Sequence, residues 1–129
     1  MDTHSQELLE QYRSLLPVYS EMAEIIPEKL KGFFDEAGLI VAAVEHRVKT
    51  EGSLTGKLQL KGGKYSSIYD ITDIIGIRVI TFYIDDVDKV ASVLERLFEI
   101  DWENSVDKRK AHETDSFGYL SLHYICRIP

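Results

Sequence analysis

One segment limits the fold more than any other: the apolar run IIGIRVITFYI, from Ile74 to Ile84. It is rich in β-branched and aromatic residues and is bounded by acidic residues, a composition that predicts a β-strand. The helical pattern DDVDKVASVLERLF follows, and Asp85 or Asp86 is expected to cap that helix. A strand followed directly by an amphipathic helix indicates a layered fold in which helices cover a sheet.

The first 38 residues predict helices. Apolar side chains recur every three or four positions and so share one helix face. These residues are Leu8, Tyr12, Leu15, Tyr19, Met22 and Ile26. Pro17 and Pro27 interrupt the run, and Pro27 is expected to begin a second helix that ends near Gly38. The apolar face is expected to pack against the core.

Three further segments favour strands. The segment LIVAAVEHRV, residues 39–48, is either a buried strand or the end of a helical hairpin. A short strand is expected near DWENSVDK, residues 101–108, and the alternating segment YLSLHYICRI, residues 119–128, predicts another. Helical residues 1–38 and a core of residues 39–129 therefore predict a single α+β domain, with a mixed β-sheet flanked by helices.

Composition restricts the class of protein. The 129 residues include 22 acidic and 15 basic ones, a net charge of −7, so nucleic acid is not an expected partner, although a local cationic pocket is compatible. The single cysteine, Cys126, allows no internal disulfide and suits a reducing cytoplasm. No apolar run approaches the length of a membrane span, and the polar N-terminus is unlike a secretory signal.

The segment RVKTEGSLTGK gathers cations and a hydroxyl in this acidic chain. Arg47 and Lys49 would share a strand face, because alternate strand residues point the same way. Ser53 can cap a helix, and Lys57 then lies one turn further along. Cations beside a helix N-terminus can bind a polyphosphate, because the unpaired N–H groups favour negative charge. The alternative is a solvated helix face whose lysines bind nothing.

Two other sequence features suggest ligand contacts. Asp70 and Asp73 precede the central strand; Asp73 is a candidate magnesium ligand beside the phosphate site, whereas Asp70 is expected to bind its own turn. Tyr119 and His123 share a strand face about 13 Å apart, and the Tyr119 ring could stack on a base. The alternative is a half-buried sheet face with a hydrogen-bonded histidine.

Four segments together resemble the RelA/SpoT-type (p)ppGpp synthetase domain, in particular the small stand-alone alarmone synthetases. They are RVKTEGSLTGK, DITDIIGIRVITFYIDDVDKV, NSVDKRK and FGYLSLHY. The resemblance covers residues 44–124 and implies a fold related to nucleotidyltransferases. It implies GTP pyrophosphokinase activity: transfer of the β,γ-pyrophosphate of ATP to the 3′-hydroxyl of GDP or GTP, with Mg²⁺, in the stringent response.

The resemblance also implies roles for individual residues. Asp73 matches the catalytic, magnesium-binding aspartate, and Arg78 occupies a basic position of the catalytic site. The residues that match the ATP-binding positions are Arg47, Lys49, Ser53 and Lys57. The residues that match the guanine-nucleotide-binding positions are Lys108, Tyr119 and His123, with Tyr119 as the stacking ring.

The sequence departs from the family pattern after the tyrosine motif. Family members carry a Glu-x-Gln-x-Arg-Thr segment whose glutamate helps to activate the 3′-hydroxyl, and residues 1–129 contain no such segment. The domain is therefore expected to be incomplete at its C-terminus and inactive alone, with an open sheet edge through which copies could form a homo-oligomer. Asp115 stands where long synthetases often carry a lysine. The alternatives are a non-catalytic guanine-nucleotide-binding module and an RNA-binding domain.

Overall fold

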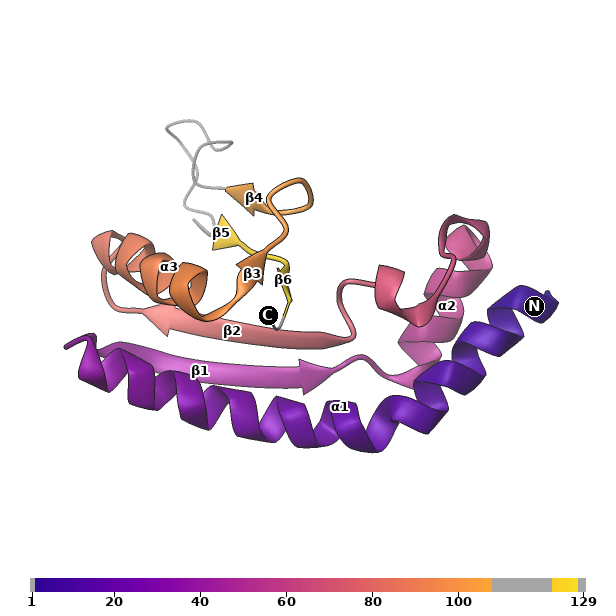
Figure 1. Cartoon of the computed structure of the whole chain (residues 1–129), viewed down its shortest axis with the longest axis horizontal. Coiled ribbons are helices and arrows are strands. Elements are labelled where there is room, and N and C mark those ends of the chain that lie inside the picture. The colour runs from indigo at the N-terminus through magenta and orange to yellow at the C-terminus, as the bar shows by residue number, and fades with distance from the viewer. Residues whose placement is uncertain (1, 108–121, 128–129) are drawn as a thin grey trace. The chain divides into compact units, whose positions relative to one another are not determined.

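The computed structural model describes residues 2–107 and 122–127 (Figure 1). In chain order, the longer elements are α1 (Thr3–Glu36), β1 (Val41–Val48), α2 (Glu51–Lys61), β2 (Ile75–Thr81) and α3 (Asp85–Leu97). The shorter ones are the 3₁₀ turns η1 (Gly62–Lys64) and η2 (Ile68–Asp70) and the strands β3 (Glu99–Ile100), β4 (Val106–Asp107), β5 (Leu122–His123) and β6 (Cys126–Arg127). These elements confirm the α+β class. No helix in the described part of the chain is long and apolar enough to cross a membrane.

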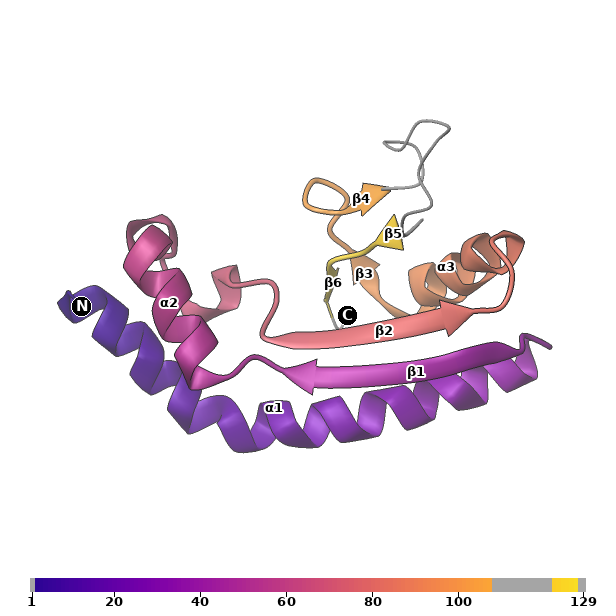
Figure 2. The same cartoon turned by 180° about the vertical axis from the view of Figure 1, so that it is seen from behind.

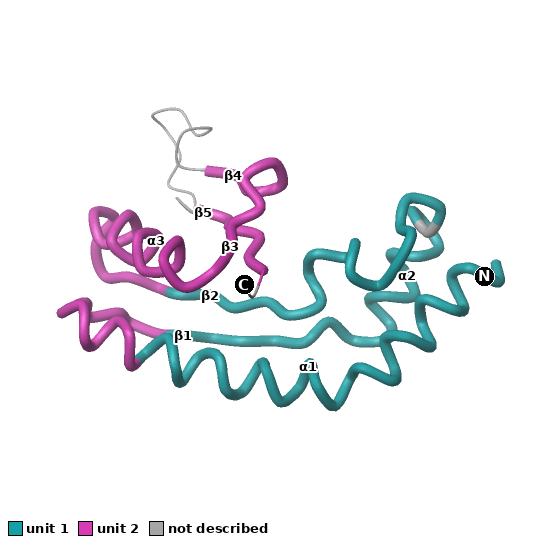
Figure 3. The backbone as a smooth tube through the Cα atoms, in the orientation of Figure 1, with its two compact units in different colours: residues 1–31, 44–79 teal, residues 32–43, 80–129 magenta. Residues whose placement is uncertain are grey.

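The chain divides into two compact units (Figure 3). Unit 1 comprises residues 1–31 and 44–79, and unit 2 comprises residues 32–43 and 80–129. The border passes through α1, β1 and β2, so each unit contains part of these three elements. The cation-rich segment and Asp73 all belong to unit 1, where they can be described together.

Helix α1 is continuous over 34 residues, and the expected break between two helices is wrong. Pro17 and Pro27 both lie inside it, although an interior proline removes a hydrogen bond and costs about 3 kcal/mol. The apolar face continues across Pro27, because Ala23 and Leu30 on either side of it are both buried. Tertiary packing of an apolar face supplies most of a helix's stability, so it can outweigh the local preference to stop.

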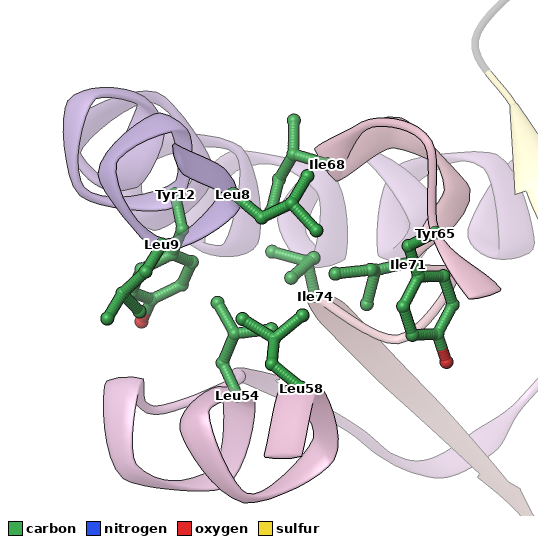
Figure 4. Packing of buried hydrophobic residues seen from close by; sticks show 9 residues of the cluster. All are labelled: Leu8, Leu9, Tyr12, Leu54, Leu58, Tyr65, Ile68, Ile71 and Ile74. Carbon is green, nitrogen blue, oxygen red and sulfur yellow. The ribbon is translucent and has the colours of Figure 1, made fainter. Parts of the chain in front are cut away.

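The core of unit 1 joins α1, α2 and the turns before β2 (Figure 4). Its buried side chains are Leu8, Leu9, Tyr12, Leu54, Leu58, Tyr65, Ile68, Ile71 and Ile74. Helix α2 contributes Leu54 and Leu58, which are one turn apart and therefore share its inner face. This packing fixes the position of α2, and hence the direction in which its charged side chains leave the helix.

Strands β1 and β2 pair with each other, and their arrows point in opposite directions (Figures 1 and 2). The segment 39–48 is thus mainly a strand and not part of a helical hairpin. Just beyond the end of β1, the Lys49 amide donates a hydrogen bond to the Ile74 carbonyl at 2.6 Å. Within unit 1, a Cβ built on Gly76 would lie 3.4 Å from the Arg47 side chain, so Arg47 lies against the β2 backbone there.

Helix α3 in unit 2 confirms the helix expected after the central strand, with Val90, Ala91 and Val93 buried. The expected aspartate cap is wrong, because the N-cap residue is Ile84 and makes no side-chain hydrogen bond. Backbone bonds form the first turn instead: the Asp86 amide donates to the Tyr83 carbonyl at 3.1 Å. The first-turn aspartates still favour the helix, since negative charge is stabilised near a helix N-terminus.

The short strands of unit 2 pair antiparallel, β3 with β6 and β4 with β5. Strand β4 confirms the strand expected within residues 101–108. The expected C-terminal strand is interrupted, because the Ile125 amide donates to the Ser105 hydroxyl at 2.9 Å and the Ile125 carbonyl accepts from Asp101 at 2.8 Å. At Ile125 the pairing of β5 with β4 therefore ends before the pairing of β6 with β3 begins. The described strands form three two-stranded sheets, whereas one mixed sheet was expected.

Candidate functional site

Thr50 caps α2 at the start of the candidate site. Its hydroxyl accepts a hydrogen bond from the Ser53 amide at 3.2 Å, and its carbonyl accepts from the Leu54 amide at 2.9 Å. The expectation that Ser53 caps this helix is therefore wrong, because a capping threonine precedes it by three residues. Ser53 lies exposed in the first turn of α2, near the end of the helix at which backbone amides lack partners within the helix.

Asp73 lies between two lysines. Its Oδ2 is 2.9 Å from Lys49 Nζ, and its Oδ1 is 3.0 Å from Lys57 Nζ. Lys49 follows β1, Lys57 belongs to α2, and Asp73 precedes β2, so three separate segments of unit 1 meet here. The sequence pointed to all three as members of one site, and the structure brings them together as the Lys–Asp–Lys cluster.

The Lys–Asp–Lys cluster is partly shielded from water. The side chains of Lys49, Lys57 and Asp73 are 14%, 25% and 41% exposed. Burial alone would raise the pKa of Asp73, but the hydrogen bonds from both lysines outweigh it and lower that pKa below its ordinary value. Burial alone would lower the pKa of Lys57, but the bond to Asp73 outweighs it and raises that pKa. Both groups are therefore charged at neutral pH.

Two tyrosines of the unit 1 core contact Lys49 and Lys57. The Tyr12 hydroxyl donates a hydrogen bond to the Lys49 carbonyl at 2.5 Å, and Lys57 Nζ lies 5.8 Å from the centre of the Tyr65 ring, a cation–π contact. Sequence reasoning missed both contacts. Tyr12 was expected only on an apolar helix face, and nothing in the segment KGGKY signals that the Tyr65 ring turns toward a lysine.

Two arginines lie on the paired strands of unit 1. Arg47 covers Gly76, and Arg78 follows Gly76 by two positions in β2, so the two arginines share one face of the strand pair. Both are exposed. Neither forms an ion pair with another residue in the described ranges, in contrast to the two lysines.

The two aspartates before β2 do different things. Asp70 Oδ2 accepts hydrogen bonds from the Ser66 and Ser67 amides at 2.9 and 3.1 Å, which confirms its turn role. Asp73 is left as the carboxylate of the cluster. Among residues 2–107 and 122–127, no three His, Cys, Asp or Glu side chains are grouped to hold a metal ion. One carboxylate nevertheless fits Mg²⁺ that arrives with a nucleotide, because substrate phosphates and water then supply the other ligands.

The guanine side of the predicted site is described only at His123. This residue lies exposed in β5 of unit 2, opposite Val106 in the antiparallel register. Lys108, Asp115 and Tyr119 lie outside the described residues. Their assignments, and that of His123, remain predictions.

The sequence comparisons decide the family. The family described as "Region found in RelA / SpoT proteins" matches residues 46–128. The chain belongs to the RelA/SpoT family. The match includes the Lys–Asp–Lys cluster and both arginines, and it confirms the resemblance noted from the sequence segments.

A curated relative is the protein named GTP pyrophosphokinase YwaC from Bacillus subtilis (strain 168). It is 29% identical over 138 aligned positions, which cover 98% of this chain and 65% of the relative. The chain therefore spans slightly less than two thirds of the length of that relative. Nearly all of this chain is aligned, so the likeness extends beyond the family region into the N-terminal helix.

Proposed function

We propose that this chain forms the ATP-binding part of a GTP pyrophosphokinase, which transfers the β,γ-pyrophosphate of ATP to the 3′-hydroxyl of GDP or GTP and so makes (p)ppGpp. The Lys–Asp–Lys cluster carries the proposal, because it joins two cations and one carboxylate from three segments within 3.0 Å contacts. Membership of the RelA/SpoT family and a relative named GTP pyrophosphokinase support it.

The residues of unit 1 suit the charge of the reaction. Phosphoryl-type transfer depends on positioning and on neutralising negative charge, and covalent help from the protein is small. Lys49 and Lys57 would contact phosphate oxygens of ATP, and Arg47 and Arg78 would add two cations on the strand face. The Ser53 hydroxyl would contribute a neutral donor at the helix N-terminus.

Asp73 is the residue that would hold Mg²⁺. The ion, when bound, would neutralise charge on the transferred pyrophosphate. An aspartate with a lowered pKa is ionised throughout the physiological range, as a magnesium ligand must be. While the substrate binds, Tyr12 would hold the backbone of Lys49, and the Tyr65 ring would lie beside the Lys57 ammonium group.

The guanine nucleotide is assigned to Lys108, Tyr119 and His123. The Tyr119 ring would stack on guanine, a contact worth about 1–3 kcal/mol per base, and so align the 3′-hydroxyl with the ATP phosphates. Because both substrates are intracellular nucleotides, the proposed site of action is the cytoplasm.

The proposed activity is tested by label transfer. ATP labelled at the γ-phosphate is incubated with Mg²⁺ and GDP or GTP, with this chain and with the longest product of its gene. Labelled (p)ppGpp that requires guanine nucleotide and disappears in Asp73→Asn, but not in Asp70→Asn, would support the proposal. Binding of both nucleotides without transfer by either protein would instead indicate a non-catalytic nucleotide-binding module. Displacement of both nucleotides by RNA would indicate an RNA-binding domain.

A further inference from the structure

We propose that Asp73 is an internal counter-ion, which occupies the phosphate-binding lysines until magnesium and nucleotide bind together. The identity of the ligand rests on the proposed function. The observation is that Lys49 and Lys57, the two lysines assigned to phosphate, both bind the one carboxylate assigned to the metal. Before magnesium or nucleotide binds, the carboxylate that would bind the metal is therefore paired with the lysines that would bind phosphate.

The geometry of the cluster resembles that of a bound phosphate. Each carboxylate oxygen of Asp73 accepts a hydrogen bond from one lysine: Oδ2 from Lys49 Nζ at 2.9 Å and Oδ1 from Lys57 Nζ at 3.0 Å. These are distances of charge-assisted hydrogen bonds. Two phosphate oxygens could take the same two donors. A carboxylate in that position thus competes directly with the phosphate for the lysines.

The backbone of each lysine is held by groups other than Asp73. Lys49 is fixed through its carbonyl by the buried Tyr12, and Lys57 extends from a helix whose Leu54 and Leu58 are buried. Tyr65 adds the cation–π contact to Lys57. Neutralising Asp73 should therefore leave both lysines on a fixed backbone, from which their side chains can still reach an anion at the position of the carboxylate.

The charges make each single ligand unfavourable. Metal-free ATP would have to separate Asp73 from Lys49 and Lys57 and then lie beside a partly buried carboxylate that has lost its cations. Magnesium alone would have to displace two ammonium groups and remain beside them. When both bind, magnesium takes the carboxylate and the phosphates take the lysines. The binding of each ligand therefore favours the binding of the other, which is a coupling free energy between two sites.

Replacing Asp73 with asparagine tests whether its charge keeps metal-free ATP from the lysines. Asp73→Asn keeps the size of the side chain and removes its charge, so both lysines become available to phosphate without magnesium. We expect metal-free ATP to bind this variant about tenfold or more tightly than it binds the wild type, the equivalent of one charge-assisted hydrogen bond regained. The preference for magnesium–ATP over metal-free ATP should then disappear.

The experiment measures ATP affinity by calorimetry in EDTA and in excess Mg²⁺, after circular dichroism has confirmed that each protein is folded. The proteins are the wild type, Asp73→Asn, and Asp70→Asn as the matched control. Asp70 carries the same charge three residues away but binds backbone amides and none of the lysines that the structure describes. Asp73→Ala provides the same comparison if Asp73→Asn does not fold.

The inference is supported if the wild type binds magnesium–ATP at least about tenfold more tightly than metal-free ATP, if Asp73→Asn gains metal-free affinity, and if Asp70→Asn behaves as the wild type. It is overturned if the wild type binds ATP equally with and without magnesium, or if Asp73→Asn gains nothing in EDTA. Either result would leave the proposed function intact. Failure of the wild type and of both Asp73 variants to bind ATP in either buffer would overturn the proposed function as well.

Discussion

The candidate site of unit 1 has a lysine half and an arginine half, which differ in how their charges are balanced. In the lysine half, Lys49 and Lys57 are mostly buried and both bind Asp73. In the arginine half, Arg47 and Arg78 are exposed on a strand face and form no ion pair with any described residue. Two cations are present in each half, but among the residues that the structure describes only the lysine half includes an anion paired with them.

This difference suggests that the lysine half and the arginine half contact nucleotides under different conditions. An approaching anion can meet the arginines without displacing a charge from residues 2–107 or 122–127, and their planar donors suit phosphate oxygens. It can reach the lysines only after Asp73 has found another cation. The arginine half should therefore attract nucleotides with or without magnesium, whereas the lysine half should contribute only when magnesium is present.

The largest expected effect concerns the core beneath the lysine half. Leu54→Ala should lower the free energy of unfolding by about 2–5 kcal/mol, because Leu54 is completely buried between α2 and the rest of the unit 1 core. Leu60→Ala is the matched control on the same helix; Leu60 is 85% exposed, and its change should stay within about 0.5 kcal/mol. Denaturant unfolding measures both. Equal losses in the two variants would mean that α2 is not held by this core.

The second effect compares one cation from each half. In magnesium, Lys57→Ala and Arg47→Ala should each weaken ATP binding by about 1.5–3 kcal/mol, roughly tenfold or more in affinity. In EDTA, Arg47→Ala should cost about as much as before, whereas Lys57→Ala should cost less, because Asp73 already occupies Lys57. Calorimetry of folded variants measures all four values. Identical costs in both buffers would remove the distinction between the halves.

Much of this arrangement could be predicted from the sequence. The helical stripe, the central strand and the amphipathic α3 follow from local periodicity, which an isolated segment already displays. Lys49, Lys57 and Asp73 could be named as site residues from their types, their spacing and the family resemblance. The pairing of Asp73 with both lysines could not be predicted, because it depends on where the core places α2 relative to the turn before β2.

The incorrect predictions share one physical cause. A local rule was applied where packing or a neighbouring residue decides the outcome. The prolines of α1 did not end the helix, because buried residues on both sides hold it together. Thr50, and not Ser53, caps α2. Both residue types favour the N-cap position, and only one residue can occupy it. Which residue caps a helix, and where the helix ends, is decided by contacts in the folded structure. The sequence pattern alone does not distinguish between the possible residues.

A third prediction tests the anchor of the lysine half. Tyr12→Phe removes the hydroxyl that donates to the Lys49 carbonyl and keeps the buried ring, so the free energy of unfolding should fall by about 0.5–1.5 kcal/mol. Tyr83→Phe is the control, because Tyr83 is 72% exposed and its change should be close to zero. If denaturant unfolding shows no difference between the two variants, the hydroxyl does not anchor Lys49.

The smallest expected effect is the pH dependence that the Lys–Asp–Lys cluster gives to folding. The pKa of Asp73 is lower in the folded chain than the ordinary value of about 3.9, so its stabilising contribution is present above that value. The contribution is lost as the pH falls through the lowered pKa. Since Asp73 is 41% exposed, solvent screening keeps the effect modest.

Unfolding free energies measured from pH 7 to pH 3 should therefore decrease more steeply for the wild type than for Asp73→Asn. Other carboxylates with lowered pKa values, Asp2, Glu51 and Asp101, are present in both proteins, so the difference between the curves belongs to Asp73. Arg47→Ala should follow the wild-type curve, because no described carboxylate pairs with Arg47. Parallel curves for the wild type and Asp73→Asn would show that the lysines do not hold Asp73 in solution. The lysine half and the arginine half would then not differ in how their charges are balanced.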